Sequence, residues 1–115
     1  MDRTVTDERS IKVAGLAIHC ERTDDLAVIT LSGDLSLANA DAFQQQLQRI
    51  EAAGVAEIVV DLRNLDFIDS TGVRTMYSAS IRLREGDRLR IIPGPAQVQR
   101  AFATSGVARV FPFID

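Results

Sequence analysis

The segment Asp61-Leu-Arg-Asn-Leu-Asp-Phe-Ile-Asp-Ser-Thr-Gly-Val73 carries the clearest structural signal in this chain. The apolar run that leads into it, residues 58–62, predicts a buried strand, and a short turn then precedes a second apolar pair, Phe67 and Ile68. Apolar and small side chains next recur at the spacings of three and four that are typical of a helix: Val73, Met76, Tyr77, Ser80 and Leu83. The stretch therefore predicts a strand that ends where an amphipathic helix begins.

Ser70 stands at the expected start of this helix. Asp and Ser are preferred N-cap residues, because their side-chain oxygens accept hydrogen bonds from the unpaired N–H groups of the first turn. We therefore expect Ser70 to be an exposed N-cap. Gly72 nearby has no side chain that could shield the hydroxyl of Ser70. A phosphate added to this hydroxyl would meet the positive end of the helix dipole. Capping alone remains the plainer interpretation of Ser70.

Strands alternate with helices along the rest of the chain. Residues 1–13 are expected to form a loose or partly paired N-terminal arm, and residues 14–115 one α/β domain. The first two strands suit a hairpin, whereas the later alternation implies βαβ units, so we expect a small mixed, mainly parallel sheet with helices packed over it. The expected strands are 16–21, 26–31, 57–62, 88–92 and 107–114, the expected helices are 39–53, 70–84 and 96–104, and 33–37 is expected to be a loop.

The composition limits the possible classes of function. A chain of 115 residues with 46% hydrophobic and 25% charged residues is typical of one globular domain. Its net charge of −3 argues against a protein that coats nucleic acid. No apolar run approaches 18 residues and the N-terminus is polar, so we predict no membrane span and no signal peptide, and expect a cytoplasmic protein. Lys12 is the only lysine, which excludes a P-loop nucleotide site.

His19 and Cys20 are the only histidine and the only cysteine. The alternating strand pattern places Cys20 on the same face as Leu16 and Ile18, where a buried thiol is expected. His19 falls on the opposite face, beside Glu21. Because a metal site needs more ligands than one His and one Cys on opposite faces, no metal site is predicted.

Several segments resemble the STAS family, and within it the bacterial anti-sigma factor antagonists. Asp69-Ser70-Thr71-Gly72 is similar to the motif in which this family phosphorylates the first Ser. The order and spacing of other segments extend the resemblance over roughly residues 14–114, and these segments are Gly33-Asp34-Leu35, 58–62, 64–68 and 102–107. The resemblance implies the same mixed sheet with helices over it, and it makes Ser70 a phosphorylation site rather than a catalyst.

The resemblance also implies a partner switch. The unphosphorylated protein would bind a kinase-type anti-sigma factor and release a sigma factor, and phosphorylation of Ser70 would abolish binding. The expected partner is thus an anti-sigma factor with serine kinase activity, and a serine phosphatase is a further candidate. No cofactor, nucleic acid or membrane is expected to bind, and the chain is expected to be a monomer or a weak homodimer. The implied docking residues are Asp34, Leu35, Ser36, Asp69, Ser70, Thr71, Gly72, Val73 and Arg74.

Two alternative functions compete with this hypothesis. A STAS adaptor subunit of a membrane transport system or of a stress-sensing scaffold would keep the fold, but the intact Ser70 favours the switch. An enzyme is disfavoured because no base lies near Ser70 in the sequence. Asp66 and Asp69 resemble a catalytic carboxylate pair, yet Asp66 falls in an expected turn and Asp69 in a capping position. One feature departs from the family, since many members carry an acid where this chain has Ser36.

Overall fold

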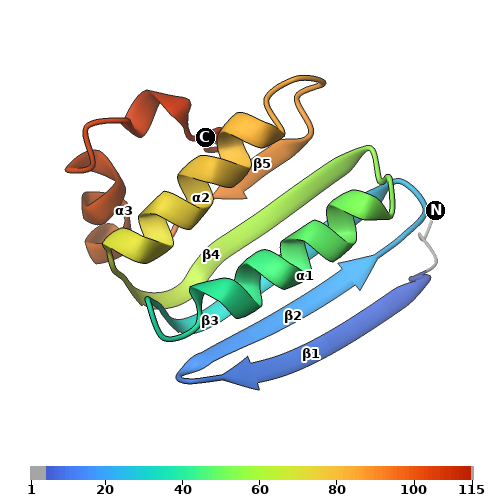
Figure 1. Cartoon of the computed structure of the whole chain (residues 1–115), viewed down its shortest axis with the longest axis horizontal. Helices are drawn as coiled ribbons and strands as arrows, with labels where there is room; N and C mark the ends of the chain where they lie inside the picture. The colour runs from blue at the N-terminus through green and yellow to red at the C-terminus, as the bar shows by residue number, and fades with distance from the viewer. Residues whose placement is uncertain (1–4, 115) are drawn as a thin grey trace.

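The computed structural model describes residues 5–114, which form one sheet with helices packed over it (Figure 1). The strand order in the sheet is β1-β2-β3-β4-β5. The strands are β1 (Asp7–Val13), β2 (Leu16–Arg22), β3 (Leu26–Leu35), β4 (Glu57–Ile68) and β5 (Leu89–Ile92). The helices are α1 (Ala40–Ala52), α2 (Ser70–Arg82) and α3 (Ala96–Ala103), and a short 3-10 helix, η1 (Ala108–Val110), follows them.

The sheet is evenly mixed. The β1–β2 and β2–β3 pairs are antiparallel, whereas the β3–β4 and β4–β5 pairs are parallel. The predicted mixed sheet is confirmed, but its mainly parallel character is not. The difference arises because a second hairpin, at the N-terminus, adds an antiparallel pair.

Residues 7–13, expected in a loose or partly paired arm, form the strand β1, which pairs with β2 along its whole length. Ala14 and Gly15 join the two strands with positive φ angles of 46° and 87°, the backbone that a two-residue type I′ hairpin turn requires. The strand was concealed in the sequence because few of its side chains are apolar and Ala is an unusual first residue for such a turn. Residues 1–4 of the predicted arm lie outside the described residues.

β3 and β4 are both longer than the sequence pattern predicts. β3 includes residues 33–35 of the expected loop, and β4 runs without a break to Ile68, through the expected turn. Register shifts between the two strands let the pairing continue past this irregular stretch. Gly33 has a φ of +96°, and a Cβ there would clash with the carbonyl oxygen of Gly15. The C-terminal ends of β3 and β4 consequently lie side by side, with Leu35 paired to Ile68.

The prediction of a last strand at 107–114 is wrong. The segment contains η1 and then forms only an isolated parallel bridge between Ile91 and Phe113. Pro112 lacks an N–H group, so it cannot extend a ladder along the short strand β5. Phe111 and Phe113 instead pack edge-on against Phe102 of α3, with ring centroids 4.7 and 5.2 Å from it.

The helices cover one face of the sheet and leave the other face of β1, β2 and β3 open. α1 and α2 lie side by side over the covered face, and α3 packs beside α2 (Figure 1). Phe43 of α1 is fully buried, and Cys20 is 2% exposed, as the sequence predicted. His19 projects from the open face with 39% of its side chain exposed. No helix within residues 5–114 is long and apolar enough to cross a membrane.

Candidate functional site

The start of α2 is capped by Asp69 rather than by Ser70. Asp69 has an extended backbone, and its Oδ1 accepts a hydrogen bond from the N–H group of Gly72 at 2.9 Å. The interpretation of Ser70 as the N-cap is therefore wrong by one position, because Ser70 is the first residue inside the helix. Ser70 is exposed, and within the described part of the chain its hydroxyl makes no hydrogen bond.

Asp69 also joins the two segments that the family resemblance implicated in docking. Its second carboxylate oxygen, Oδ2, accepts a hydrogen bond from the N–H group of Leu37 at 2.9 Å. Its own N–H group donates to the carbonyl oxygen of Leu35 at 3.1 Å. One side chain thus fixes the loop after β3 against the first turn of α2, and residues 34–36 lie next to residues 69–74.

Asn39 is a buried organiser of this loop that the sequence analysis did not single out. It is 2% exposed, and its Oδ1 accepts a hydrogen bond from the N–H group of Ser36 at 2.9 Å. Its Nδ2 donates to the carbonyl oxygens of Asp34 at 2.8 Å and Ala14 at 3.0 Å. An Asn at the first position of the predicted helix 39–53 was the available signal, since Asn favours helix N-termini and turns.

The predicted docking residues divide into surface and support. Asp34, Ser70 and Arg74 are exposed, and Ser36, Asp69 and Thr71 are half-buried. Leu35, Gly72 and Val73 are buried, so they can only shape the surface from beneath. A Cβ on Gly72 would lie 2.7 Å from Ile68 Cγ1 and 2.9 Å from the carbonyl oxygen of Leu35. Gly72 is therefore needed because the start of α2 packs closely against the ends of β3 and β4.

A cavity of about 460 Å³ opens beside Ser70, between α2 and α3. The surface of its wall is mainly apolar, although Ser70, Arg74 and other polar residues also line it. Neither α3 nor the segment that follows it appeared in the sequence-based list of docking residues, so their contribution is new. The lining residues are Ile68, Asp69, Ser70, Val73, Arg74, Tyr77, Ala101, Thr104, Ser105 and Val107.

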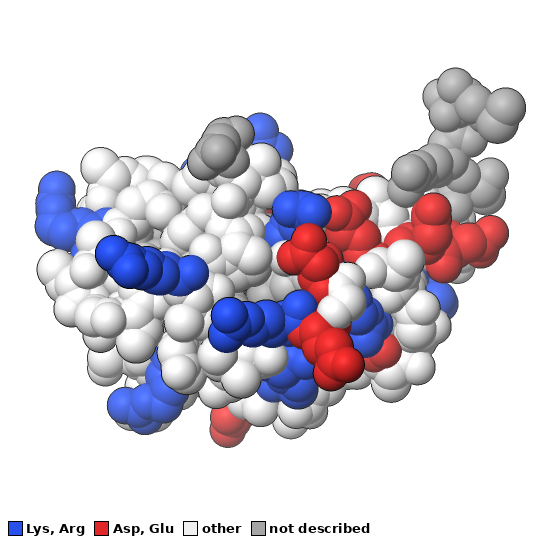
Figure 2. Space-filling model, turned by 90° about the horizontal axis from the view of Figure 1, so that it is seen from above, with Lys and Arg blue, Asp and Glu red and all other residues white. Residues whose placement is uncertain are grey.

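Charged side chains are distributed unevenly around this site. In the view of Figure 2, acidic side chains gather toward the end of the molecule away from α3, whereas the α3 end carries separated basic side chains on uncharged surface. Arg82 and Arg90 are held in ion pairs, Arg82 with Glu51 at 2.7 Å. Arg74 forms no ion pair within residues 5–114. Its guanidinium group is therefore available beside Ser70.

This arrangement of strands and helices, with Asp-Ser-Thr-Gly at the start of α2, defines a class of domain. The chain belongs to the STAS domain family, which matches it over residues 17–115. BtrV of Bordetella bronchiseptica, provisionally named an anti-sigma factor antagonist, is 28% identical over 93 residues, 80% of each chain. The anti-sigma F factor antagonist of Paenibacillus polymyxa is 26% identical over 102 residues, 87% of each chain.

Solved structures show the same fold. The crystal structure of an anti-sigma factor antagonist from Mycobacterium paratuberculosis superposes with a TM-score of 0.77 at 20% identity, over 85% of this chain and 84% of that chain. The murine anion transporter Slc26a9 contains a similar domain, with a TM-score of 0.62 at 17% identity over 96% of this chain and 19% of the transporter. At such identities the likeness establishes the fold alone.

Proposed function

We propose that this STAS domain is an anti-sigma factor antagonist whose binding to its partner is controlled by phosphorylation of Ser70. The observation that carries the proposal is the division of roles at the start of α2. Asp69 supplies the capping oxygen, so the exposed hydroxyl of Ser70 is not needed to hold the helix. The hydroxyl can therefore be modified without loss of a structural hydrogen bond. The names of the relatives support the same class of function.

The surface around Ser70 suits a protein partner. Asp34 and Arg74 are exposed and Ser36 is half-buried on this surface, and Arg74 also lines the cavity. Phe67 and Leu37 nearby are 51% and 78% exposed. Exposed apolar side chains beside a cavity are typical of protein-binding sites. We assign this surface to an anti-sigma factor with serine kinase activity.

A phosphate on Ser70 would disfavour this docking. It adds a charge of about −1.5 to −2 at pH 7, which a partner's apolar or acidic surface cannot accept without loss of desolvation and Coulomb energy. In the free protein the same phosphate remains in water at the positive end of α2. The two states therefore differ in free energy, as a switch requires, and each ~1.4 kcal/mol of difference changes the affinity about tenfold.

The surroundings of Ser70 favour a substrate over a catalyst. Both carboxylate oxygens of Asp69 accept hydrogen bonds from backbone N–H groups, and no His or Lys lines the cavity. His19 lies on the open face of the sheet, away from the helices. Without a base to activate it, Ser70 is a poor nucleophile. We therefore propose that a serine kinase phosphorylates this residue and that a serine phosphatase reverses the reaction.

The proposal is tested with the cognate anti-sigma factor and ATP. Mass spectrometry should locate the phosphate on Ser70, and Ser70→Ala should remain unmodified while binding the partner as the unphosphorylated protein does. Ser70→Glu should bind at least about tenfold more weakly, equivalent to ~1.4 kcal/mol. Its free energy of unfolding should stay within about 0.5 kcal/mol of the wild-type value, because the side chain is exposed.

Thr71 provides the matched control for this experiment. It follows Ser70 in the same helical turn and is half-buried, so Thr71→Ala should leave the phosphorylation of Ser70 in place. Phosphate found mainly on Thr71, or equal partner affinities for Ser70→Ala and Ser70→Glu, would contradict the proposal. An adaptor function without a switch would give the second of these results.

A further inference from the structure

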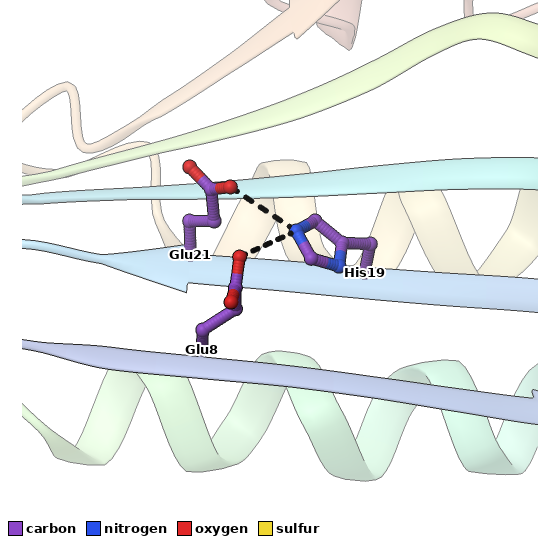
Figure 3. Close-up of side chains that lie close together, drawn as sticks. All are labelled: Glu8, His19 and Glu21. Atoms are coloured by element: carbon purple, nitrogen blue, oxygen red, sulfur yellow. Dashed lines mark hydrogen bonds and ion pairs between the residues drawn. The ribbon is translucent and has the colours of Figure 1, made fainter. Parts of the chain in front are cut away.

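Three side chains that can bind a metal ion meet on the open face of the sheet, at its β1–β2 edge. Glu8 projects from β1, and His19 and Glu21 project from β2 (Figure 3). One ligand atom from each residue can be chosen so that all three lie within 4.8 Å of one another. The pairing of the strands explains the cluster, because Glu8 stands directly opposite Glu21 and Ser10 directly opposite His19.

The distances in the cluster fit a small ion. His19 Nε2 lies 3.4 Å from Glu8 Oε2 and 3.2 Å from Glu21 Oε1. Two ligand atoms bound tetrahedrally to zinc at about 2.0–2.1 Å lie roughly 3.3–3.4 Å apart. The nitrogen is thus already separated from each of the two oxygens by about the edge of such a tetrahedron, so an ion could enter with little movement of the strands.

Ser10 orients the imidazole ring for this purpose. Its Oγ lies 2.6 Å from His19 Nδ1, whereas the two carboxylates approach the other ring nitrogen, Nε2. When Nδ1–H donates to this oxygen, the lone pair of Nε2 points between Glu8 and Glu21. Histidine ligands in metal sites characteristically donate their other ring N–H to an oxygen in this way, which fixes the tautomer and the ring orientation.

The two glutamates provide an independent electrostatic reason for a cation at this point. Carboxylates that face each other directly across an antiparallel pair repel and destabilise it. Glu8 of the edge strand β1 and Glu21 of β2 are paired in this manner. A divalent ion between them would replace the repulsion with attraction to both strands.

We propose that Glu8, His19 and Glu21 form a Zn²⁺ site, with solvent as the fourth ligand and Ser10 as the residue that positions His19. One imidazole and two carboxylates suit zinc, whereas Mg²⁺ prefers six oxygen ligands in an octahedron. The ion would fasten the edge strand β1 to β2. The site lies on the sheet face opposite the helices, so it does not depend on the function proposed for Ser70.

The test uses the single histidine of the chain as its reporter. Untagged, ¹⁵N-labelled protein is titrated with Zn²⁺ while the imidazole resonances of His19 are followed by NMR. We expect a saturable shift of Nε2 at one ion per chain, and a higher midpoint of thermal unfolding, because a ligand that binds only the folded state stabilises it. Mg²⁺ at the same concentrations should cause neither change.

Four variants distinguish Zn²⁺ binding at this specific site from non-specific binding to surface carboxylates. Glu8→Gln and Glu21→Gln should each weaken Zn²⁺ binding by more than tenfold, and Ser10→Ala should weaken it by about tenfold, as loss of an orienting partner does. Glu85→Gln, which removes an exposed carboxylate outside the cluster, should bind as the wild type does. Failure of Zn²⁺ to saturate His19, or equal affinities for Glu8→Gln, Glu21→Gln and Glu85→Gln, would overturn the proposal.

Discussion

Asp69 and Ser70 have different roles although they are neighbours. Asp69 uses both carboxylate oxygens for backbone N–H groups, one in α2 and one in the loop after β3. Ser70 contributes an exposed hydroxyl on the rim of the cavity, with Arg74 one helical turn later. Residues four positions apart face the same side of a helix, and an anion that precedes a cation by this spacing is the favourable order. A phosphate on Ser70 would therefore meet the guanidinium group of Arg74.

Arg74 should stabilise the more highly charged form of a phosphoserine at position 70. The second pKa of phosphoserine is about 6, and a nearby cation lowers it. With phosphoserine installed at position 70 by codon suppression, the pKa measured by ³¹P NMR should be higher in Arg74→Gln than in the otherwise wild-type chain. This measurement needs no kinase, so it is independent of how the phosphate is added.

Arg84→Gln is the matched control, because Arg84 is exposed and follows the end of α2, at the opposite end of the helix from Ser70. It should leave the pKa of the phosphate unchanged. Equal pKa values in the wild-type, Arg74→Gln and Arg84→Gln backgrounds would show that Arg74 does not contact the phosphate.

At the level of elements, the site depends on the ends of β3 and β4 and on the first turn of α2. These parallel strands end side by side, and Gly72 lets α2 begin close above them. Asp69 then ties the helix to the loop through the N–H group of Leu37. The shape of the docking surface is thus set by backbone contacts more than by the exposed side chains.

Asp69→Ala should destabilise the domain by about 1–2 kcal/mol, because it removes a helix cap and leaves the N–H group of Leu37 without its partner. Asp69→Asn keeps one acceptor oxygen and should lose less. Both free energies of unfolding can be measured in urea at constant pH. A stability of Asp69→Ala equal to that of the wild type would mean that neither hydrogen bond matters for folding.

The sequence predicted the elements with strong apolar periodicity and missed those held by context. Helix α1 and strand β2 were expected, because their buried positions recur at regular spacings. Strand β1 was not predicted, because its pairing depends on the neighbouring strand and on an unusual turn rather than on its own apolar residues. A final strand was predicted at 107–114, but Pro112 and the short β5 prevent a ladder.

The candidate site was predictable in part. The Asp-Ser-Thr-Gly motif located the start of α2, and only the assignment of the cap differed by one residue. The cavity could not be predicted, because it depends on how α3 and the following segment pack beside α2. The proposed zinc ligands could not be grouped from the sequence for a similar reason. His19 and Glu21 were recognised on one strand, but Glu8 joins them only through the register of β1.

For the molecule as a whole, ion pairs connect the sheet to the helices and the helices to each other. Asp7 of β1 pairs with Arg49 of α1 at 3.0 Å, and Glu51 of α1 pairs with Arg82 of α2 at 2.7 Å. The hydrogen bond from Arg49 lowers the pKa of Asp7 below its ordinary value of 3.8. This contact makes the stability of the domain depend on pH.

The sign of that dependence follows from the lowered pKa. Asp7 contributes its stabilisation fully above its ordinary pKa of 3.8 and loses it as the pH falls below that value, because the unfolded chain then takes up the proton first. Replacing Asp7 with Asn should therefore flatten the fall in unfolding free energy between about pH 5 and 3. Asp24→Asn, at an exposed bend, should leave the slope as in the wild type. Parallel curves for Asp7→Asn and the wild type would refute this.

The buried thiol of Cys20 can serve as a probe of local unfolding in this domain. Cys20 lies between Arg9 of β1 and Ile29 of β3 in the sheet, and desolvation raises its pKa. Thiol reagents attack the thiolate and need access, so they can reach Cys20 only while the structure around it is locally open. The ratio of its labelling rate to that of a free thiol therefore reports the free energy of the opening that exposes this part of the core.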